Sequence, residues 1–355
     1  VQGTGSTPAI LTLNQSPGFD YGTVPIGASQ DVTLTLTNSG GVSATALAGG
    51  GLAAPFAFKG SGFPGTGGTC GTSLAASASC TIVVTYTPTT AAVHSDTVEI
   101  SYNDGLVVQS ADRNLQGTGV TVANLSISGA PFYDFGTRIV GSSTDVVLTI
   151  SNSGGFAASS IGGAGLAAPF SFKGGSYPGT GGTCSSSIAA AANCTIVVTY
   201  APTVTGLLTD TVEISYSNGV SAQTALRAIQ GTAVTAASLV ISNGPTYDFG
   251  TRATGSSTDA IFTITNSGGS TASAMAGGAL AAPYTFKGGA YPGTGGTCAT
   301  SLASAANCTV VVTFAPTVTG TLPATLTLDY DNGLAATSAT RGLTGVAVGP
   351  AQLTI

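Results

Sequence analysis

Apolar and polar residues alternate with a period of two along many short segments of this chain. In residues 31–37, three branched apolar side chains alternate with polar ones, mostly threonine, and residues 97–102 show a similar alternation. In residues 80–86, even-numbered positions are predicted to face a core and Val83 to face outward among threonines. Alternation in β-branched runs is typical of half-buried antiparallel strands. About seven strands are expected in the first part of the chain, near residues 9–13, 31–38, 43–48, 55–59, 80–87, 96–103 and 107–116.

Turn signals separate these segments, and long helical periodicity is absent. Asn-Asp-Gly at 103–105, Ser-Asn-Gly at 217–219 and Asp-Asn-Gly at 331–333 predict hairpin turns, in which glycine supplies a positive φ. Only the alanine-rich stretches at 73–79 and 189–193 could form one short helical turn. Short strands between regular turns predict an all-β protein of the β-sandwich class.

The sequence of 355 residues repeats itself every 114 residues without slipping by one position. Of its 24 Phe and Tyr residues, 21 fall into seven columns of this repeat, which indicates one core built three times. A unit of 114 residues can bury a core of its own. Because no flexible linker separates the units, they are expected to dock end to end as a rod. The predicted units are residues 7–120, 121–234 and 235–348.

The two ends of the chain repeat parts of a unit. Residues 1–6 are expected to form the last strand of a preceding unit, and residues 349–355 the first strand of a following one. Two explanations stay open. The chain is cut from a longer array, or its ends pair with neighbouring copies as donated strands.

Several columns resemble a known family. They are Phe/Tyr-Gly-Thr at 21–23, 135–137 and 249–251, Leu-Thr-Asn-Ser-Gly at 36–40, Cys-Thr-Ile-Val-Val-Thr-Tyr-x-Pro-Thr at 80–89 and Leu-Gln-Gly-Thr-Gly at 115–119. In these residues the chain resembles the bacterial choice-of-anchor D repeats, which are immunoglobulin-like modules related to the ASH/MSP-type sandwiches. The resemblance implies three tandem immunoglobulin-like β-sandwich domains, and a place in a large secreted or surface protein.

Cysteine usage points to an oxidising compartment. The six cysteines form one pair per unit at one spacing, and the chain has a single histidine. Zinc sites use sets of four Cys or His ligands, so disulfides are favoured over metal. Disulfides persist outside the reducing cytosol, which predicts an extracellular or periplasmic protein. The pairs are Cys70/Cys80, Cys184/Cys194 and Cys298/Cys308.

The lysines raise a second covalent possibility. Each unit contains a single lysine, in the sequence Phe-Lys-Gly. One hypothesis is an intramolecular isopeptide bond between Lys59, Lys173 or Lys287 and Asn38, Asn152 or Asn266 of the same unit, assisted by a nearby aspartate. The alternative is an exposed lysine at the end of a strand.

No set of residues predicts catalysis, and the chain is not expected to be an enzyme. Asp-Phe-Gly at 134–136 and 248–250 matches a kinase metal motif, but no phosphate loop or catalytic loop accompanies it. It is interpreted as a carboxylate and an aromatic at a strand-ending turn. His94 aligns with Leu208 and Leu322, so no triad recurs. We therefore expect no catalytic, cofactor-binding or metal-binding site, and no cofactor.

The surface composition suggests the function. Charged residues make up 6% of the chain, and eight Lys and Arg against fourteen Asp and Glu leave no basic face for nucleic acid. No apolar run approaches the roughly 20 residues of a membrane-spanning helix. Uncharged strand faces repeated at constant spacing suit contact between copies, because burying charge is costly.

These features predict a structural fibre or filament protein at the cell surface or in the extracellular matrix, with other copies of itself as partners. The alternative is a cell-surface adhesin or glycan-binding stalk, with surface glycans as partners. Its candidate residues would be Phe63, Tyr177 and Tyr291 in the Pro-Gly loops.

Overall fold

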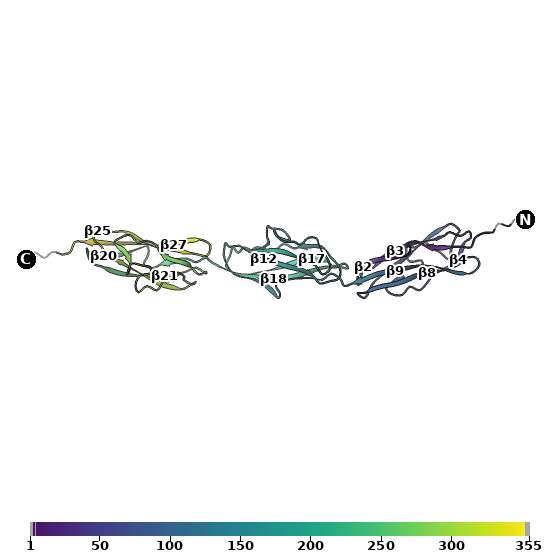
Figure 1. The fold of residues 1–355 in the computed structure, drawn as a ribbon. Coiled ribbons are helices and arrows are strands. Elements are labelled where there is room, and N and C mark those ends of the chain that lie inside the picture. The colour runs from purple at the N-terminus through teal and green to yellow at the C-terminus, as the bar shows by residue number, and fades with distance from the viewer. Residues whose placement is uncertain (1–2, 4, 352–355) are drawn as a thin grey trace, which may run out of the picture.

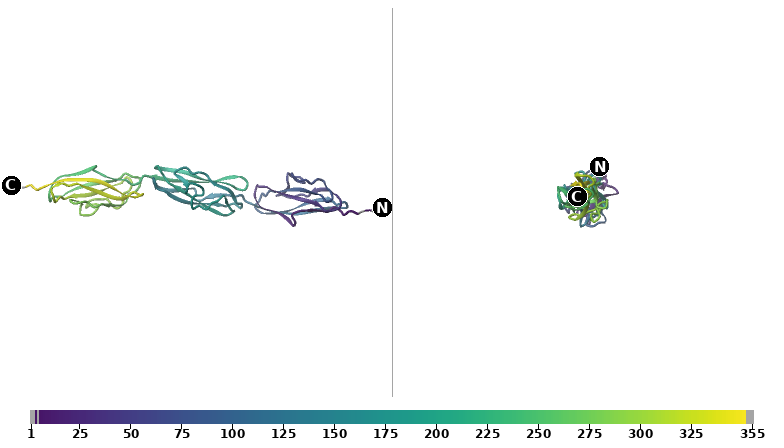
Figure 2. Two further views of the ribbon diagram at one scale, coloured as in Figure 1. Left: turned by 90° about the horizontal axis from the view of Figure 1, so that it is seen from above. Right: turned by 90° about the vertical axis from the view of Figure 1, so that its left-hand side faces the viewer.

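Three β-sandwich units lie end to end in a rod (Figure 1). The computed structural model describes residue 3 and residues 5–351. Viewed along the axis, the three units overlap within one narrow outline (Figure 2). The predicted all-β class and three-unit architecture are confirmed. Of the predicted strands at 1–6 and 349–355, residues 1–2, 4 and 352–355 lie outside the described residues, and the described residues of both segments are not in strands.

The first unit contains two sheets that enclose its core. One sheet has the strand order β1-β3-β7-β5, and the other has the order β2-β9-β8-β4-β6. Most neighbouring strands are antiparallel, but β2 is parallel to β9. The strands are β1 (Leu11–Leu13), β2 (Gly18–Pro25), β3 (Gln30–Asn38), β4 (Ala44–Gly49), β5 (Phe56–Phe58), β6 (Ser73–Leu74), β7 (Ser79–Tyr86), β8 (Val93–Asn103) and β9 (Val108–Val120).

The other two units repeat this arrangement. The second unit contains β10 (Leu125–Ile127), β11 (Phe132–Ile139), β12 (Thr144–Asn152), β13 (Ala158–Gly163), β14 (Phe170–Phe172), β15 (Ser187–Ile188), β16 (Asn193–Tyr200), β17 (Gly206–Ser217) and β18 (Ala222–Val234). The third contains β19 (Leu239–Ile241), β20 (Thr246–Ala253), β21 (Thr258–Asn266), β22 (Ser273–Gly277), β23 (Tyr284–Phe286), β24 (Asn307–Phe314), β25 (Gly320–Thr321), β26 (Ala324–Asp331) and β27 (Ala336–Val348).

Strand β2 is absent from the expected set because a bulge interrupts its alternation. The register with β9 shifts between Asp20 and Thr23. Gly22 has a φ of +68°, and its N–H donates to Asp20 Oδ1 at 2.7 Å. Such bulges need a residue that tolerates positive φ. The aspartate-aromatic-glycine sequence therefore lies inside a strand, which corrects its interpretation as a strand-ending turn.

A trio of aromatic rings fills the centre of each sandwich. In the first unit, Phe56 stacks on Tyr86 with ring centroids 4.8 Å apart, and Tyr21 lies 5.3 Å from Tyr86. Phe56 and Tyr86 are fully buried. Aromatic pairs in such geometry contribute about 0.5–1.5 kcal/mol beyond their buried area. The equivalent rings occupy the same places in the second and third units, so the repeated aromatic columns are the cores.

The prediction that Val83 faces solvent is wrong. Val83, Val197 and Val311 are only 7%, 5% and 4% exposed. The Lys59 N–H donates to the Val83 carbonyl at 3.0 Å, while the Lys59 amine reaches Asp31 on β3, across β7. The Val83 N–H also donates to the Pro64 carbonyl at 2.8 Å, so the loop that follows β5 runs alongside Val83 and limits its exposure.

A buried asparagine ties the end of β3 to its surroundings. Asn38 is 0% exposed, and its five side-chain hydrogen bonds measure 2.9–3.2 Å. Its Oδ1 accepts from the N–H groups of Ile10 and Gly40, and its Nδ2 donates to the carbonyls of Val42, Leu74 and Ala75. Asn152 and Asn266 occupy the same buried position in the other units.

Asn38→Ala is expected to destabilise the first unit by about 3 kcal/mol, because several buried backbone groups lose their partner. The measurement is urea unfolding of the whole chain, with hydrogen exchange assigning the loss to the first unit. Asn14→Ala is the control, since exposed Asn14 accepts one bond from Thr35 and its loss should cost under about 1 kcal/mol. Equal effects of the two changes would contradict the role given to Asn38.

Candidate functional site

The junctions between units contain no spare residue. At the end of the first unit, the Val120 carbonyl accepts the Ile26 N–H at 2.8 Å. The next residue, Thr121, already belongs to the second unit, where its Oγ1 accepts the Gly155 N–H at 2.8 Å. The second junction repeats this pattern with Val234 and Thr235. Consecutive residues are thus fixed in adjacent sandwiches.

A hairpin tip adds a side contact at each junction. The tip between β17 and β18 approaches the end of β2 so closely that a Cβ on Gly219 would lie 2.9 Å from the Pro25 ring. Gly219 also has a φ of +97°, so both the close approach and the backbone conformation require glycine. At the second junction, a Cβ on Gly333 would lie closer still to the Ile139 side chain. Apolar contact beside a continuous backbone restricts bending between units.

Every lysine of the chain forms the same cluster on the outer face of a four-stranded sheet. Lys59 Nζ lies 2.6 Å from Asp31 Oδ2, and the Thr85 hydroxyl donates to Asp31 Oδ1 at 2.6 Å. The ion pairs Lys173–Asp145 and Lys287–Asp259 measure 2.8 Å. The lysine hydrogen bond, followed by that of the threonine, lowers the pKa of Asp31. The same causes lower the pKa of Asp145 and Asp259.

This arrangement contradicts the isopeptide hypothesis. Asp31 and Asn38 stand at opposite ends of β3, seven residues apart, which is about 23 Å along a strand. Lys59 lies at the Asp31 end, while the Asn38 amide is buried and fully engaged. Lys173 and Lys287 likewise pair with aspartates and do not meet Asn152 or Asn266. The lysines are half-exposed residues at strand ends.

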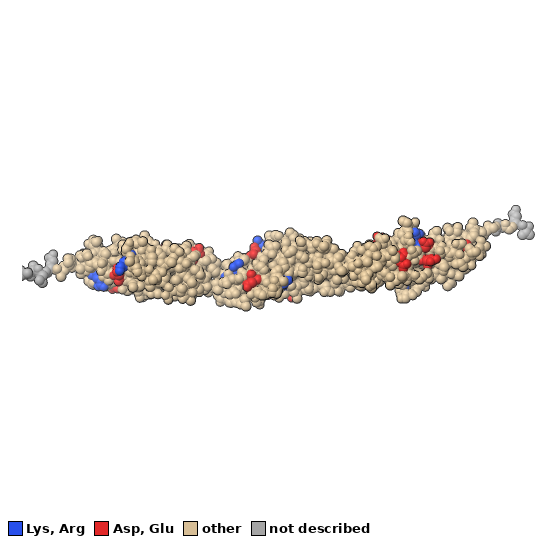
Figure 3. All heavy atoms as spheres, turned by 60° about the horizontal axis from the view of Figure 1, so that its bottom comes forward, with Lys and Arg blue, Asp and Glu red and all other residues tan. Residues whose placement is uncertain are grey.

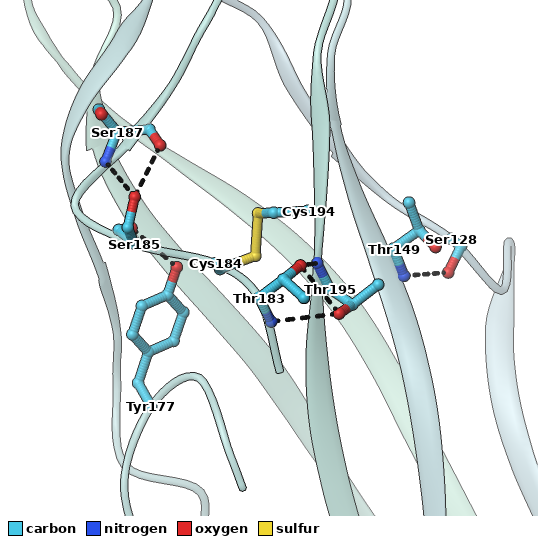
Figure 4. The surroundings of a disulfide bond; sticks show 9 residues. All are labelled: Ser128, Thr149, Tyr177, Thr183, Cys184, Ser185, Ser187, Cys194 and Thr195. Atoms are coloured by element: carbon cyan, nitrogen blue, oxygen red, sulfur yellow. Dashed lines mark hydrogen bonds between the residues drawn. A yellow bond between two sulfur atoms is a disulfide. The ribbon is translucent and has the colours of Figure 1, made fainter. Parts of the chain in front are cut away.

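The structure joins the six cysteines within their units. The S–S distances are 1.98 Å for Cys70–Cys80, 1.99 Å for Cys184–Cys194 and 1.92 Å for Cys298–Cys308. Each bond ties the long loop after β5, β14 or β23 to the neighbouring strand. Beside Cys184 and Cys194, the hydroxyls of Thr183 and Thr195 lie 3.1 Å apart, and each accepts the other residue's backbone N–H (Figure 4).

The aromatic residues considered for an adhesin pack against the sandwich. Phe63 meets Phe58 edge to face at 5.7 Å, and Tyr177 and Tyr291 make the same contact with Phe172 and Phe286. All three are partly buried against the core. His94 bonds the hydroxyls of Tyr86 and Thr90, at 2.8 and 3.0 Å. These residues have structural partners and offer no exposed aromatic platform.

The surface is largely free of charge. Figure 3 shows isolated charged side chains over a broad uncharged surface, with acidic groups gathered on the N-terminal unit. That unit contains six of the fourteen carboxylates but only Lys59 and Arg113 as cations. On the outer faces of the four-stranded sheets, Val147 and Ile261 are 60% and 62% exposed among threonines.

Two further properties apply to the described part of the chain. Residue 3 and residues 5–351 contain no group of three or more His, Cys, Asp or Glu placed to hold a metal ion. The same residues contain no helix that is long and apolar enough to cross a bilayer.

Comparisons with known proteins find the likeness in structure only. No protein-family model matches the chain, and no curated protein matches its sequence. A structure of titin domains I67–I69 matches 97% of this chain and 99% of its own, with 10% identity and a TM-score of 0.28. The structure of mouse protocadherin PcdhgC3 EC1–3 covers 76% of this chain and 83% of its own length, with 12% identity and a TM-score of 0.36. The ASH/PapD-like domain 7 of human CEP192 covers 33% of this chain and 89% of its own length, with 17% identity and a TM-score of 0.25.

These likenesses are distant, and the assignment of the fold rests on the sheet order and register of this chain. Each unit is a β-sandwich of two sheets, and the chain carries three of them in tandem.

Replacing Cys184 and Cys194 by serine is expected to destabilise the second unit by about 3 kcal/mol, the chain-entropy estimate for a loop this short. The check is denaturant unfolding of oxidised wild type and the double variant, with and without a reductant. The reductant should weaken the second unit of the wild type but not that of the variant, while it acts on the first and third units of both. A variant as stable as the oxidised wild type would refute this.

The lysine–aspartate clusters are expected to stabilise the chain above about pH 4 and to lose this contribution in acid. Because the folded-state pKa lies below the unfolded value, stability declines as pH falls through the folded pKa. An Asp31→Asn, Asp145→Asn, Asp259→Asn variant should be less stable at pH 7, by under about 1 kcal/mol per unit.

Thermal unfolding at pH 7 and in acid tests this, and the difference between variant and wild type should shrink in acid. Asp112→Asn, which removes an exposed carboxylate without an ion pair among the described residues, should show no loss at pH 7. A difference that persists unchanged in acid would contradict the assignment.

Proposed function

We propose that this chain is part of an extracellular structural fibre of the bacterial surface or matrix, in which immunoglobulin-like units associate through uncharged faces. Tandem disulfide-bonded sandwiches are suited to a modular protein in an oxidising location. The resemblance of the repeat to choice-of-anchor D modules supports a place in a large surface protein.

The repeated junction is the observation that carries this proposal. Val120 and Thr121 bind different sandwiches, and Val234 and Thr235 do the same one unit later. A chain built in this way maintains its direction from unit to unit. Identical junctions repeated along an array generate a stiff rod, which is the basic element of a fibre.

Lateral contact is assigned to the outer faces of the four-stranded sheets. Val147 and Ile261 occupy the same repeat position on β12 and β21, and Val240 on β19 is 51% exposed. Threonines and one lysine–aspartate pair per unit lie around them on the same face, so a contact between two such faces has a single ion pair per unit to accommodate. Because these contacts recur along the rod, individually weak contacts add through effective concentration.

The fibre proposal predicts an axial repeat set by the sandwich. The strands run along the rod, and the 13 residues of β9 span about 44 Å, so electron microscopy of native filaments should show that spacing (Figure 1). Purified chain should also associate as its concentration rises, measured by sedimentation. A chain that stays monomeric and is absent from surface filaments would refute the proposal.

Val147→Lys with Ile261→Lys should abolish this association, because two charges would have to be buried at each contact. Leu226→Lys is the matched control. Leu226 is 56% exposed but lies on the other sheet of the second unit, and this change should leave association intact. Loss of association only in the control would place the contact on the opposite sheet and refute the assigned face.

A further inference from the structure

The first unit contains a polar groove that is about half as large in the second unit. The groove has a volume of about 720 Å³ and lies on the outer face of the sheet where β2, β9 and β8 run side by side. Register places six outward residues there in two rows of three. The rows are Gly18, Asn114 and Thr97, then Asp20, Gln116 and Ser95. Neighbouring strands lie about 4.8 Å apart, so the rows cover about the area of one or two sugar rings.

Glycine creates the room in this groove. The position of Gly18 is occupied by Phe132 in the second unit and by Thr246 in the third. A Cβ on Gly18 would lie 3.1 Å from the Asn114 carbonyl oxygen and 3.3 Å from its Cβ, so a side chain here would crowd Asn114 and take up space in the groove. The second unit has alanine opposite its phenylalanine, at Ala228, and its groove is about 330 Å³.

The polar groups in the first-unit groove are open to a ligand. In the second unit, Gln230 Nε2 donates to Asp134 Oδ2 at 3.0 Å, so the two side chains satisfy each other. Within the described residues, Gln116 and Asp20 of the first unit make no such bond. The Thr97 hydroxyl donates to Asn114 Oδ1 at 3.1 Å, and within the described residues the Asn114 amide N–H groups make no hydrogen bond.

We infer that this groove binds a neutral glycan strand. Amide N–H groups, a carboxylate oxygen and hydroxyls alternate on its surface, so it offers donors and acceptors within reach of adjacent sugar hydroxyls. The net negative charge of the first unit disfavours acidic glycans. The site is separate from the four-stranded faces assigned to assembly, and the inference does not depend on the fibre proposal.

The third unit has lost these groups. Thr344 and Ala324 stand in the positions of Gln116 and Asp96, and Gly342 stands in the position of Asn114. The large groove with this set of polar groups is therefore a feature of the first unit and not of the fold.

The test uses the whole chain with soluble hexasaccharides of neutral glucose and N-acetylglucosamine polymers. Side-chain amide resonances of Gln116 and Asn114 should shift on titration up to about 10 mM, the range of weak single-site binding. Gly18→Phe with Asn114→Ala copies the pair found in the second unit and should weaken binding at least about tenfold. Gln230→Ala, the equivalent glutamine in the second unit, is the control and should change nothing.

Gln116→Leu provides a second variant that keeps Gly18 and Asn114, and it should also weaken binding at least about tenfold. The titration is repeated with two further samples. One is polysaccharide from the cell that carries the protein, and the other is neutral polysaccharide from other cells. Comparing them shows which cell supplies the glycan that is bound. The inference is overturned if no glycan shifts these resonances. It is also overturned if both groove variants bind as wild type does, or if Gln230→Ala abolishes binding.

Discussion

The rod depends on one constraint, which is that the chain leaves one sandwich and enters the next within a single peptide bond. Val120 is bound by the first unit and Thr121 by the second, so neither residue can move without breaking a hydrogen bond. Each unit therefore inherits its orientation from its predecessor. The contact of the glycine hairpin tip with the preceding unit restricts the remaining freedom.

Within each unit, interior residues stabilise the sandwich more than outer residues do. Aromatic rings and the buried asparagine hold the interior, and these positions barely vary between units. Residues on the outer faces do not hold the interior, so they differ from unit to unit. Val147 and Ile261 replace a threonine at Thr33, while Gly18, Phe132 and Thr246 give the same sheet position three different shapes.

Periodicity in the sequence was sufficient to predict the strands, the three units and the core aromatics. It failed for β2, because the bulge at Gly22 breaks the alternation on which the prediction relies. It also failed for Val83, whose outward direction is correct by alternation but which lies beside the loop that follows β5. The lysine–asparagine hypothesis failed for a related reason, since neighbours across a sheet depend on register. The groove at Gly18 depends on which residues lie opposite one another, and a single sequence does not show that pairing.

The parallel pairing of β2 with β9 determines how the molecule responds when it is pulled. The strands run along the rod, and the chain leaves each unit at the end of β9. Tension along the axis therefore slides β9 past β2, and loads the hydrogen bonds between them in shear. Bonds loaded side by side must break together, whereas bonds at a peeling end break one at a time. The same ladder that closes the sandwich thus makes each unit a mechanical clamp.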